Sequence, residues 1–525
     1  MFDGCTSELL IACKITVLWL NIFTFKLLSK QIMTFEEYYK SFGFKKYPFG
    51  VFTSEGEVDV FNSIFLKPQN HSVILEGLSH TSAIVIGERG TGKTALSLAF
   101  ADNLKSSKNL IVRIEEFSGL KANYDTEELY KFLIEHLAAS FFMQYAETPT
   151  TLWKYSKEER IDLSMYLHSY LGATTKALLR DKINKIQNNI FKRAAISSYN
   201  IIRTVINFGL KAATKAASDV LTKHFSSLPA FDSGDAEYFK KIESDVDESF
   251  TSEQKQYFYL EKLCRLIKKY GLEKIYIIID KIDEDPRFQN DAEDIADYIK
   301  NIVSNNKILT NSQLHVILFL WSTPFNHVKD VTRTQKLSFF PLTWDRGQLE
   351  LVLQKRLTAY SECEVKNYNE IFDNCAIESI DLVFCMCNRN PRDLWHILNK
   401  AFQEQHSINS SSKICDLAIS NAVEKFVKEF NYYEYYPKKS NSRANTMDVY
   451  KYIKHLLKLD SPTFTKDRLN SVAGTGSATN NYVTAMENMG LIKNSNGKAQ
   501  GGAVIYEIAD PKVKFAMSNN ITIGD

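Results

Sequence analysis

A glycine-rich segment that follows a short apolar run constrains this chain more than any other feature. Residues 83–86 read Ala-Ile-Val-Ile, which predicts a buried parallel strand. Residues 87–94 then read Gly-Glu-Arg-Gly-Thr-Gly-Lys-Thr, the pattern G-x-x-x-x-G-K-T, and residues 95–100 favour a helix. Glycines let backbone N–H groups surround a phosphate, and the N-terminus of the helix adds partial positive charge. The sequence therefore predicts a phosphate-binding loop and disfavours the alternative, a glycine turn without a ligand.

Two side chains of this loop have expected roles with ATP and Mg²⁺. Lys93 is expected to reach the β- and γ-phosphates, and the Thr94 hydroxyl is expected to bind Mg²⁺. ATP and Mg²⁺ are therefore the cofactors that the loop predicts. Its predicted nucleotide-binding residues are Gly87, Glu88, Arg89, Gly90, Thr91, Gly92, Lys93 and Thr94.

A second apolar run ends in a carboxylate. Residues 275–279 are all strand formers, and Asp280 follows them directly. We expect this carboxylate to hold Mg²⁺ through water. Asp283 and Glu284 come next, where a residue that orients the attacking water is needed, and either can take this catalytic role. Taken alone, the acidic segment 281–285 also fits a solvated loop.

Two further elements fit the same design. Residues 314–320 predict a strand between the other two, and Ser322 just beyond it is expected near the γ-phosphate. Ser and Thr are common at strand ends, so an ordinary strand end is the alternative. Arg392 follows Asn390-Pro391 at a predicted helix start and is expected to reach the nucleotide from a helical lid. A capped helix start with a solvated arginine is the alternative there.

With these four elements in this order, the chain resembles the AAA+/STAND group of P-loop ATPases, including its replication-initiator-like branch. More narrowly, residues 42–50 (FGFKKYPFG) and 279–284 (IDKIDE) resemble a poorly characterised bacterial P-loop ATPase family that is often associated with antiphage defence. The resemblance covers about residues 40–435. It implies an α/β fold with a three-layer P-loop NTPase core of the ASCE/AAA+ type, built on a central parallel sheet. A helical insert, a helical lid and a C-terminal winged helix complete the implied architecture.

The same resemblance implies an activity and partners. We expect an ATP-binding and hydrolysing molecular switch, acting in bacterial antiviral-defence signalling with a partner effector protein. A homo-oligomer is implied too, with an arginine supplied by a neighbouring subunit, for which Arg333 and Arg346 are candidates. In many relatives the catalytic base directly follows the metal-binding carboxylate, whereas this chain has Lys281 there. The assignment of the base is therefore open between the two later carboxylates.

Patterns along the chain predict four parts. The core is expected over residues 33–341 with a helical insert at about 125–260, the lid over 342–435 and the winged helix over 436–525. Residues 1–32 contain an apolar run with only 11 residues between Lys14 and Lys26, whereas about 20 are needed to span a membrane. We expect a dispensable or artefactual extension before Met33 rather than a membrane anchor.

The insert has a strongly uneven charge. Residues 171–224 hold ten Lys and Arg against two acids, a net charge of +8, and residues 231–253 hold eight acids against two lysines, a net charge of −6. Three interpretations compete for this pair of segments. It can be a helical subdomain closed by its own acidic segment, a nucleic-acid or membrane-surface face, or a docking site for a partner.

The end of the chain predicts three helices, at 449–459, 465–473 and 477–489, and then a β-hairpin that turns within 494–502. That order is typical of a winged helix. The third predicted helix contains no Lys or Arg, although DNA-reading helices normally bring phosphate contacts with them. The pattern favours a protein-docking or packing module, and DNA remains the weaker alternative partner.

Charge and cysteine usage limit the remaining classes of protein. The chain of 525 residues has 64 Lys and Arg against 62 Asp and Glu, which excludes a binder whose whole surface is basic. Its eight cysteines are scattered without metal-site spacing, as is usual for reduced thiols in a cytoplasmic protein. The main alternative to a signalling switch is a DNA-binding ATPase of the replication-initiator or loader class. A third is a structural or membrane-associated protein that nucleotide only stabilises.

Overall fold

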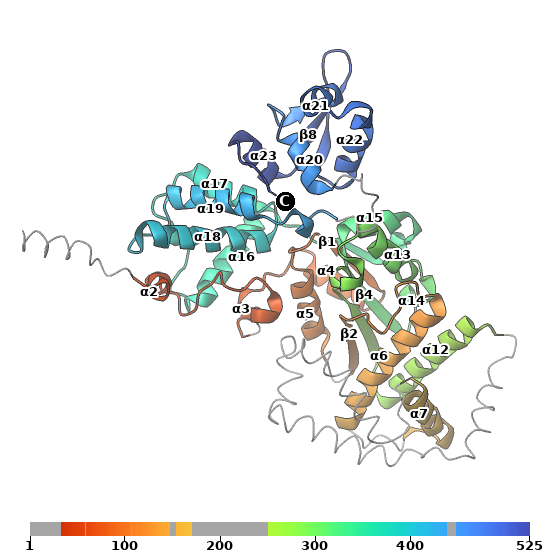
Figure 1. Ribbon diagram of the computed structural model, residues 1–525. Helices are drawn as coiled ribbons and strands as arrows, with labels where there is room; N and C mark the ends of the chain where they lie inside the picture. The colour runs from red at the N-terminus through yellow and green to blue at the C-terminus, as the bar shows by residue number, and fades with distance from the viewer. Residues whose placement is uncertain are drawn as a thin grey trace, which may run out of the picture.

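The computed structural model describes residues 33–57, 59–106, 108–147, 154–170, 250–437 and 448–524. The predicted extension at 1–32, the basic segment 171–224 and nearly all of the acidic segment 231–253 lie outside the described residues. Within them, an α/β unit, a group of helices and a smaller C-terminal unit can be followed in Figure 1. Among the described residues, no helix is long and apolar enough to cross a membrane.

A five-stranded sheet forms the centre of the α/β unit. All of its strands are parallel, and their order is β2-β3-β4-β1-β5. The strand that follows the acidic loop in the chain, β4, lies between the strands that precede the Gly-rich and acidic loops, as the sequence predicts. The five strands are β1 (Ala83–Gly87), β2 (Asn109–Ile114), β3 (Lys274–Ile279), β4 (Leu314–Trp321) and β5 (Ser338–Pro341).

Helices cover both faces of this sheet, which gives a three-layer α/β arrangement. Alternate residues of β3 separate into two apolar clusters: Ile275 and Ile277 face one, Tyr276 and Ile278 the other. Strand side chains alternate between faces, so a strand that is apolar throughout needs cover on both. The helices on the first face are α6 (Thr126–Glu147), α12 (Ser252–Tyr270), α13 (Ala292–Val303) and α15 (Ser322–Val328). Those on the second face are α4 (His71–Leu78) and α5 (Lys93–Leu104).

Two helices that begin within the predicted insert, at about 125–260, have clear end signals. Thr251 and Gln254 form a capping box at the start of α12, and Gly271, at φ 124°, follows its last residue. Such signals satisfy backbone groups that the helix itself leaves unpaired. Nearby, α7 (Lys157–Ser169) begins at a second capping box, formed by Ser156 and Glu159.

The N-terminal segment packs against the later helices. Tyr38, in α2 (Phe35–Lys40), and Phe44 and Phe49 just after it are buried in one apolar cluster with Trp395 and Phe402. The start of the described chain and α18 (Pro391–Asn409) therefore share one apolar core, although they are far apart in sequence. The helices of the group are α16 (Arg346–Tyr360), α17 (Ile377–Met386), α18 and α19 (Asp416–Glu429).

The C-terminal unit contains the three predicted helices and the predicted hairpin. In addition, β6 (Thr463–Phe464) pairs antiparallel with β8, giving the order β6-β8-β7, and α23 (Pro511–Ser518) closes the unit. A strand of two residues is too short to show an alternating pattern in the sequence. It becomes a strand only because it pairs with β8 in the folded unit. The remaining elements are α20 (Val449–Leu456), α21 (Lys466–Ala473), α22 (Thr479–Asn488), β7 (Ile492–Lys498) and β8 (Val504–Ile508).

Candidate functional site

The Gly-rich loop, residues 87–94, connects the end of β1 to the start of α5. Gly90 has φ 81° and Gly92 has φ 90°, a region that side-chain-bearing residues rarely adopt. A Cβ added to Gly90 would lie 2.5 Å from Oδ1 of Asn390, so this position also lacks space for a side chain. The loop thus bends tightly just before the N-terminus of α5, where the first N–H groups of a helix have no partner within the helix itself.

Hydrogen bonds from inside and outside the loop hold it. Lys93 is buried, and its Nζ donates to the carbonyls of Gly87 and Glu88, at 3.1 Å each. Trp344 Nε1 donates to the Thr91 carbonyl at 2.8 Å. The indole belongs to the segment after β5, so the strand neighbouring β1 helps to position the loop.

Asp280 lies at the carboxyl end of β3 and is 1% exposed. Its Oδ2 accepts from the Ser97 hydroxyl of α5 at 3.1 Å, and its Oδ1 accepts from the Lys281 N–H at 2.9 Å. Burial and the neighbouring Glu115 raise the pKa of Asp280, while Lys93 and a hydrogen bond with Thr94 oppose that rise. The Gly-rich loop and the acidic strand therefore meet at this carboxylate.

Asp283 forms a salt bridge with the Gly-rich loop. Arg89 Nε lies 2.8 Å from Asp283 Oδ2, and Arg89 Nη2 donates to the Asp283 carbonyl at 2.5 Å. The guanidinium also lies 4.3 Å above the ring of Trp321, whose Nε1 donates to Glu88 Oε2 at 2.9 Å. Burial alone would raise the pKa of Asp283, but Lys93 and Arg89 outweigh it and hold that pKa below its usual range.

Glu284, one residue further on, has a different environment. Its side chain is exposed at the cavity, and among the described residues its carboxylate has no hydrogen bond or salt bridge. Partial burial and the charge of Asp283 raise its pKa. Of the two carboxylates that the sequence left open, only this one is unengaged and faces the cavity.

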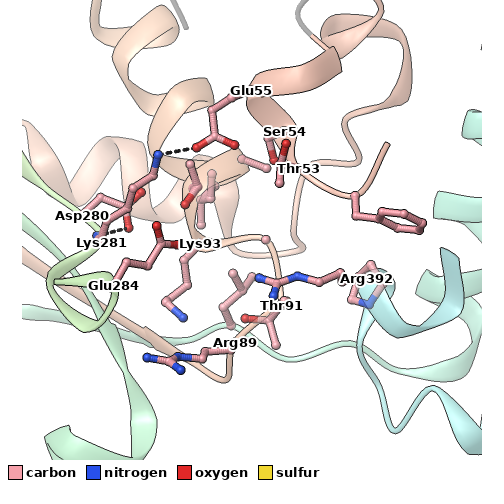
Figure 2. A pocket seen from close by; sticks show the side chains of 18 of the residues that line it. Thr53, Ser54, Glu55, Arg89, Thr91, Lys93, Asp280, Lys281, Glu284 and Arg392 are labelled. Carbon is pink, nitrogen blue, oxygen red and sulfur yellow. Dashed lines mark hydrogen bonds and ion pairs between the residues drawn. The ribbon is translucent and has the colours of Figure 1, made fainter. Parts of the chain in front are cut away.

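Lys281 directly follows Asp280, and its side chain pairs with two other carboxylates. Its backbone has φ 64°, and its Nζ pairs with Glu55 from the N-terminal segment and, at 3.3 Å, with Glu115 Oε2 at the end of β2. Figure 2 shows the Lys281–Glu55 pair on one side of the cavity and Arg392 extending from the α18 side toward the loop. The ammonium is thus neutralised by two carboxylates from separate segments.

These segments enclose a cavity of about 530 Å³ at the carboxyl edge of the sheet. Besides polar residues, its lining includes apolar side chains of the N-terminal segment and of the later helices, among them Phe52, Phe65 and Trp395. That volume is ordinary for a small-molecule site. A cavity with both polar and apolar lining residues can hold a ligand that carries charged groups and an aromatic ring.

Most of the predicted site residues come together here. The cavity is lined by Arg89, Gly90, Thr91, Gly92, Lys93, Thr94, Asp280, Asp283, Glu284 and Arg392. Gly87 and Glu88 do not line it but hold Lys93 through their carbonyls. Ser322 starts α15 and is not among the lining residues. Neither is Arg333, which is exposed, nor Arg346, which pairs with Glu350 and Asp381.

Other residues of the site escaped sequence reasoning. Glu115 ends a strand just as Asp280 does, so the same strand-end rule could have found it. Ser97 carries no such signal, because its contact with Asp280 spans 183 positions. The same holds for Glu55, which lies 226 positions from Lys281.

The donor set fits Mg²⁺ held together with a phosphate ligand. Among the described residues, no group of three or more His, Cys, Asp or Glu side chains could hold a metal ion by itself. Mg²⁺ usually keeps several waters and binds one or two carboxylates plus substrate phosphates. Asp280 and Thr94, both on the cavity, supply the kind of donors that such a site needs.

Sequence comparison adds a distant relative. No protein-family model matches the chain. Over 383 residues the chain is 24% identical to the putative transposon gamma-delta 80.3 kDa protein of Escherichia coli (strain K12). The match covers 68% of this chain and 47% of that protein, so the chain spans about half the length of the relative.

Proposed function

We propose that this chain is an ATP-binding and hydrolysing molecular switch of the AAA+/STAND type. One observation carries the proposal: Lys93, Thr94 and Asp280 line a single cavity at the carboxyl edge of a parallel sheet. Open α/β sheets bind ligands at that edge. The position of β4 between β1 and β3 supports the ASCE/AAA+-like assignment, which expects a strand between the two loop-bearing ones.

Phosphate binding follows from the loop. Its backbone N–H groups and the N-terminus of α5 would surround the phosphates, and Lys93 would exchange its two carbonyl acceptors for phosphate oxygens. Asp280 and Thr94 would hold Mg²⁺, which when bound neutralises charge on the phosphate oxygens. Arg392 lines the same cavity, where it pairs with Glu434 at 3.5 Å, and would add a positive charge near the phosphates on leaving that carboxylate.

Glu284 is the proposed residue for orienting the attacking water. Asp283 is held ionised by Arg89, and both of its contacts serve to join two loops. The Glu284 carboxylate is open to the cavity, and a raised pKa makes it a better proton acceptor than an ordinary carboxylate. Hydrolysis would then depend on positioning and charge stabilisation, without covalent chemistry.

The test is ATP binding and hydrolysis by the purified full chain, with and without Mg²⁺. Lys93→Ala is expected to lower turnover by about 10²–10³-fold, as loss of a charge-stabilising donor does in other enzymes. Lys108→Ala is the matched control, because the Lys108 side chain forms an exposed pair with Glu273, and neither residue lines the cavity. Equal turnover in wild type and Lys93→Ala would contradict the proposal, as would a wild type that neither binds nor hydrolyses ATP.

The proposed biological role is cytoplasmic signalling in antiviral defence, with a partner effector and in a homo-oligomer. It rests on the family resemblance, and the C-terminal unit, which has the helix and strand order of a winged helix, would transmit the nucleotide state. Arg333 is the better candidate for an arginine offered to a neighbouring subunit, because Arg346 is already paired. Assembly on a sizing column with ATP, lost in Lys93→Ala, is the expected result.

A DNA-binding ATPase of the initiator or loader class is the second candidate. The observation that favours it is the relative's description as a putative transposon protein. Against it, α22 contains no Lys or Arg. Binding to duplex DNA that weakens steeply with salt, together with DNA-stimulated hydrolysis, would place this function first.

A further inference from the structure

Lys512, in the first turn of α23, is completely buried. Its Nζ has no hydrogen-bond partner among the described residues and lies 4.3 Å from the ring centroid of Phe430 and 4.5 Å from that of Tyr435. Two carboxylates are close by: Asp393 Oδ2 at 3.6 Å and Asp510 Oδ1 at 3.8 Å. Removing an ammonium from water is costly, and the first turn of a helix disfavours a cation. One of these two carboxylates, Asp510, belongs to the C-terminal unit, and the nearer one, Asp393, lies outside it.

The nearest of these groups outside the C-terminal unit is Asp393, in the first turn of α18. It is 4% exposed, and burial raises its pKa to about 6, although Lys512 and Tyr435 oppose the rise. Tyr435 donates its hydroxyl proton to Asp393 Oδ2 at 2.8 Å. That hydroxyl in turn accepts from Asn390 Nδ2. A chain of contacts therefore runs from Lys512 to Asp393, then to Tyr435 and then to Asn390.

Asn390 completes the connection to the Gly-rich loop. Its side chain is buried, and Nδ2 also donates to the Arg89 carbonyl at 2.6 Å. Its Oδ1 accepts from the Arg392 N–H at 3.0 Å, which caps α18. Gly90 lies so close to this amide that no side chain fits between them. A shift of the Asn390 side chain would therefore change its contacts with Arg89 and Gly90 of the loop.

We propose that Lys512 is a positioning residue for the Gly-rich loop, acting through Asp393, Tyr435 and Asn390, and that seating of the C-terminal unit and nucleotide binding are thereby coupled. The coupling to nucleotide rests on the proposed function of this loop. It must be reciprocal: if a seated C-terminal unit favours nucleotide, nucleotide favours the seated unit to the same degree. The nucleotide affinity of the α/β unit would thus depend on whether the C-terminal unit is seated, and the seating would depend on nucleotide.

The test uses the full chain with Lys512→Met, which removes the charge at similar length, and Tyr435→Phe, which removes only the hydroxyl. Lys514→Met is the control, because Lys514 lies on the same helix but pairs with Glu507 inside the C-terminal unit. Two quantities are measured: hydrogen exchange of the amides of residues 87–94 without nucleotide, and affinity for ATP with Mg²⁺. Circular dichroism and Tm check that each variant is folded.

We expect faster exchange over residues 87–94 and at least about fivefold weaker ATP binding in Lys512→Met and Tyr435→Phe, with no change in Lys514→Met. The double variant should bind ATP no more weakly than whichever single variant has the lower affinity, because the two residues act in series. A folded Lys512→Met with wild-type loop exchange would overturn the proposal. Fully additive effects of the two substitutions would overturn it too.

If Lys512→Met does not fold, Tyr435→Phe decides, and unchanged loop exchange in that variant overturns the relay. If wild type does not bind ATP, the proposed function fails, but loop exchange in the nucleotide-free protein still decides whether Lys512 positions residues 87–94.

Discussion

Arg89 of the Gly-rich loop and Asp283 of the acidic loop form a salt bridge, with Nε 2.8 Å from Oδ2, although their strands are not neighbours in the sheet. The bridge spans the end of β4, and its guanidinium rests on Trp321 at the end of that strand. Because Asp283 is engaged in this way, the acidic loop offers Glu284 to the cavity. Under the proposed function, a structural role of Asp283 and a chemical role of Glu284 are divided between adjacent carboxylates.

Glu284→Gln is expected to abolish most hydrolysis while sparing binding. Loss of a general base typically lowers kcat by about 10²–10⁴-fold, and an amide of the same shape leaves the cavity intact. Single-turnover hydrolysis and ATP affinity should be measured on the same preparation.

Asp283→Asn is the comparison for that prediction. It should weaken ATP binding, because Arg89 loses its charged partner and the loop its anchor, with a smaller fall in kcat. A larger loss of kcat in Asp283→Asn than in Glu284→Gln would reverse the two roles.

Asp280→Asn is expected to raise the Mg²⁺ concentration needed for half-maximal hydrolysis. The carboxylate is buried among Ser97, Thr94 and Lys93, so an amide fits but carries no charge for the cation. A Mg²⁺ titration of ATPase activity measures the shift. Ser97→Ala serves as a milder variant, and an unchanged Mg²⁺ requirement in Asp280→Asn would place the cation elsewhere.

Tryptophan fluorescence should report ATP binding. Three tryptophans in the described part of the chain lie at the site: Trp321 and Trp344 contact the loop, and Trp395 lines the cavity. Rearrangement of Lys93 and the loop around phosphate should change their emission in wild type. Trp344→Phe, which loses the bond to the Thr91 carbonyl, should show a clearly smaller change. Equal signals in both proteins would mean that the loop does not move against Trp344.

Arg356→Met is expected to destabilise the fold by about 3–5 kcal/mol, the usual cost of leaving one buried charge unpaired. Arg356 is 2% exposed and forms a two-pronged pair with Glu57, and it also donates to the carbonyls of Pro48 and Val51. Urea unfolding measures the change. The exposed pair of Arg468 with Asp460 is the control, where Arg468→Met should cost about 1 kcal/mol or less.

His396 should make stability depend on pH. Burial, with Arg392 and Lys400, lowers its pKa to about 4, whereas an unfolded histidine titrates near 6.5. Its neutral form therefore contributes stability that is complete above about pH 6.5 and is lost as the pH falls toward 4. His396→Phe keeps the stacking on Phe52 but does not titrate. Between pH 7.5 and 5, wild type should lose about 1–2 kcal/mol more than this variant, and equal losses would contradict the assignment.

Much of the α/β unit was readable from sequence because its signals are local. The apolar run before Gly87, the glycines themselves and the helix after Thr94 are contiguous, and each forms the expected element. Asp280 could be placed as well, since parallel strands bring their carboxyl ends to one edge of the sheet. The apolar pattern of the strands and the position of these residues at strand ends are therefore enough to predict that Lys93, Thr94 and Asp280 lie close together.

Tertiary structure alone decided which groups engage one another. Asn390 meets the Arg89 carbonyl across 301 positions of sequence, and Lys281 meets Glu55 across 226. No local pattern encodes such contacts, because they depend on how separately folded elements pack and on which charges that packing buries. Sequence thus determined that residues such as Lys93, Thr94 and Asp280 would line one cavity. Packing determined that Asp283 joins two loops, and that Lys512 lies beside Asp393, which contacts Tyr435 and, through it, Asn390 and the Gly-rich loop.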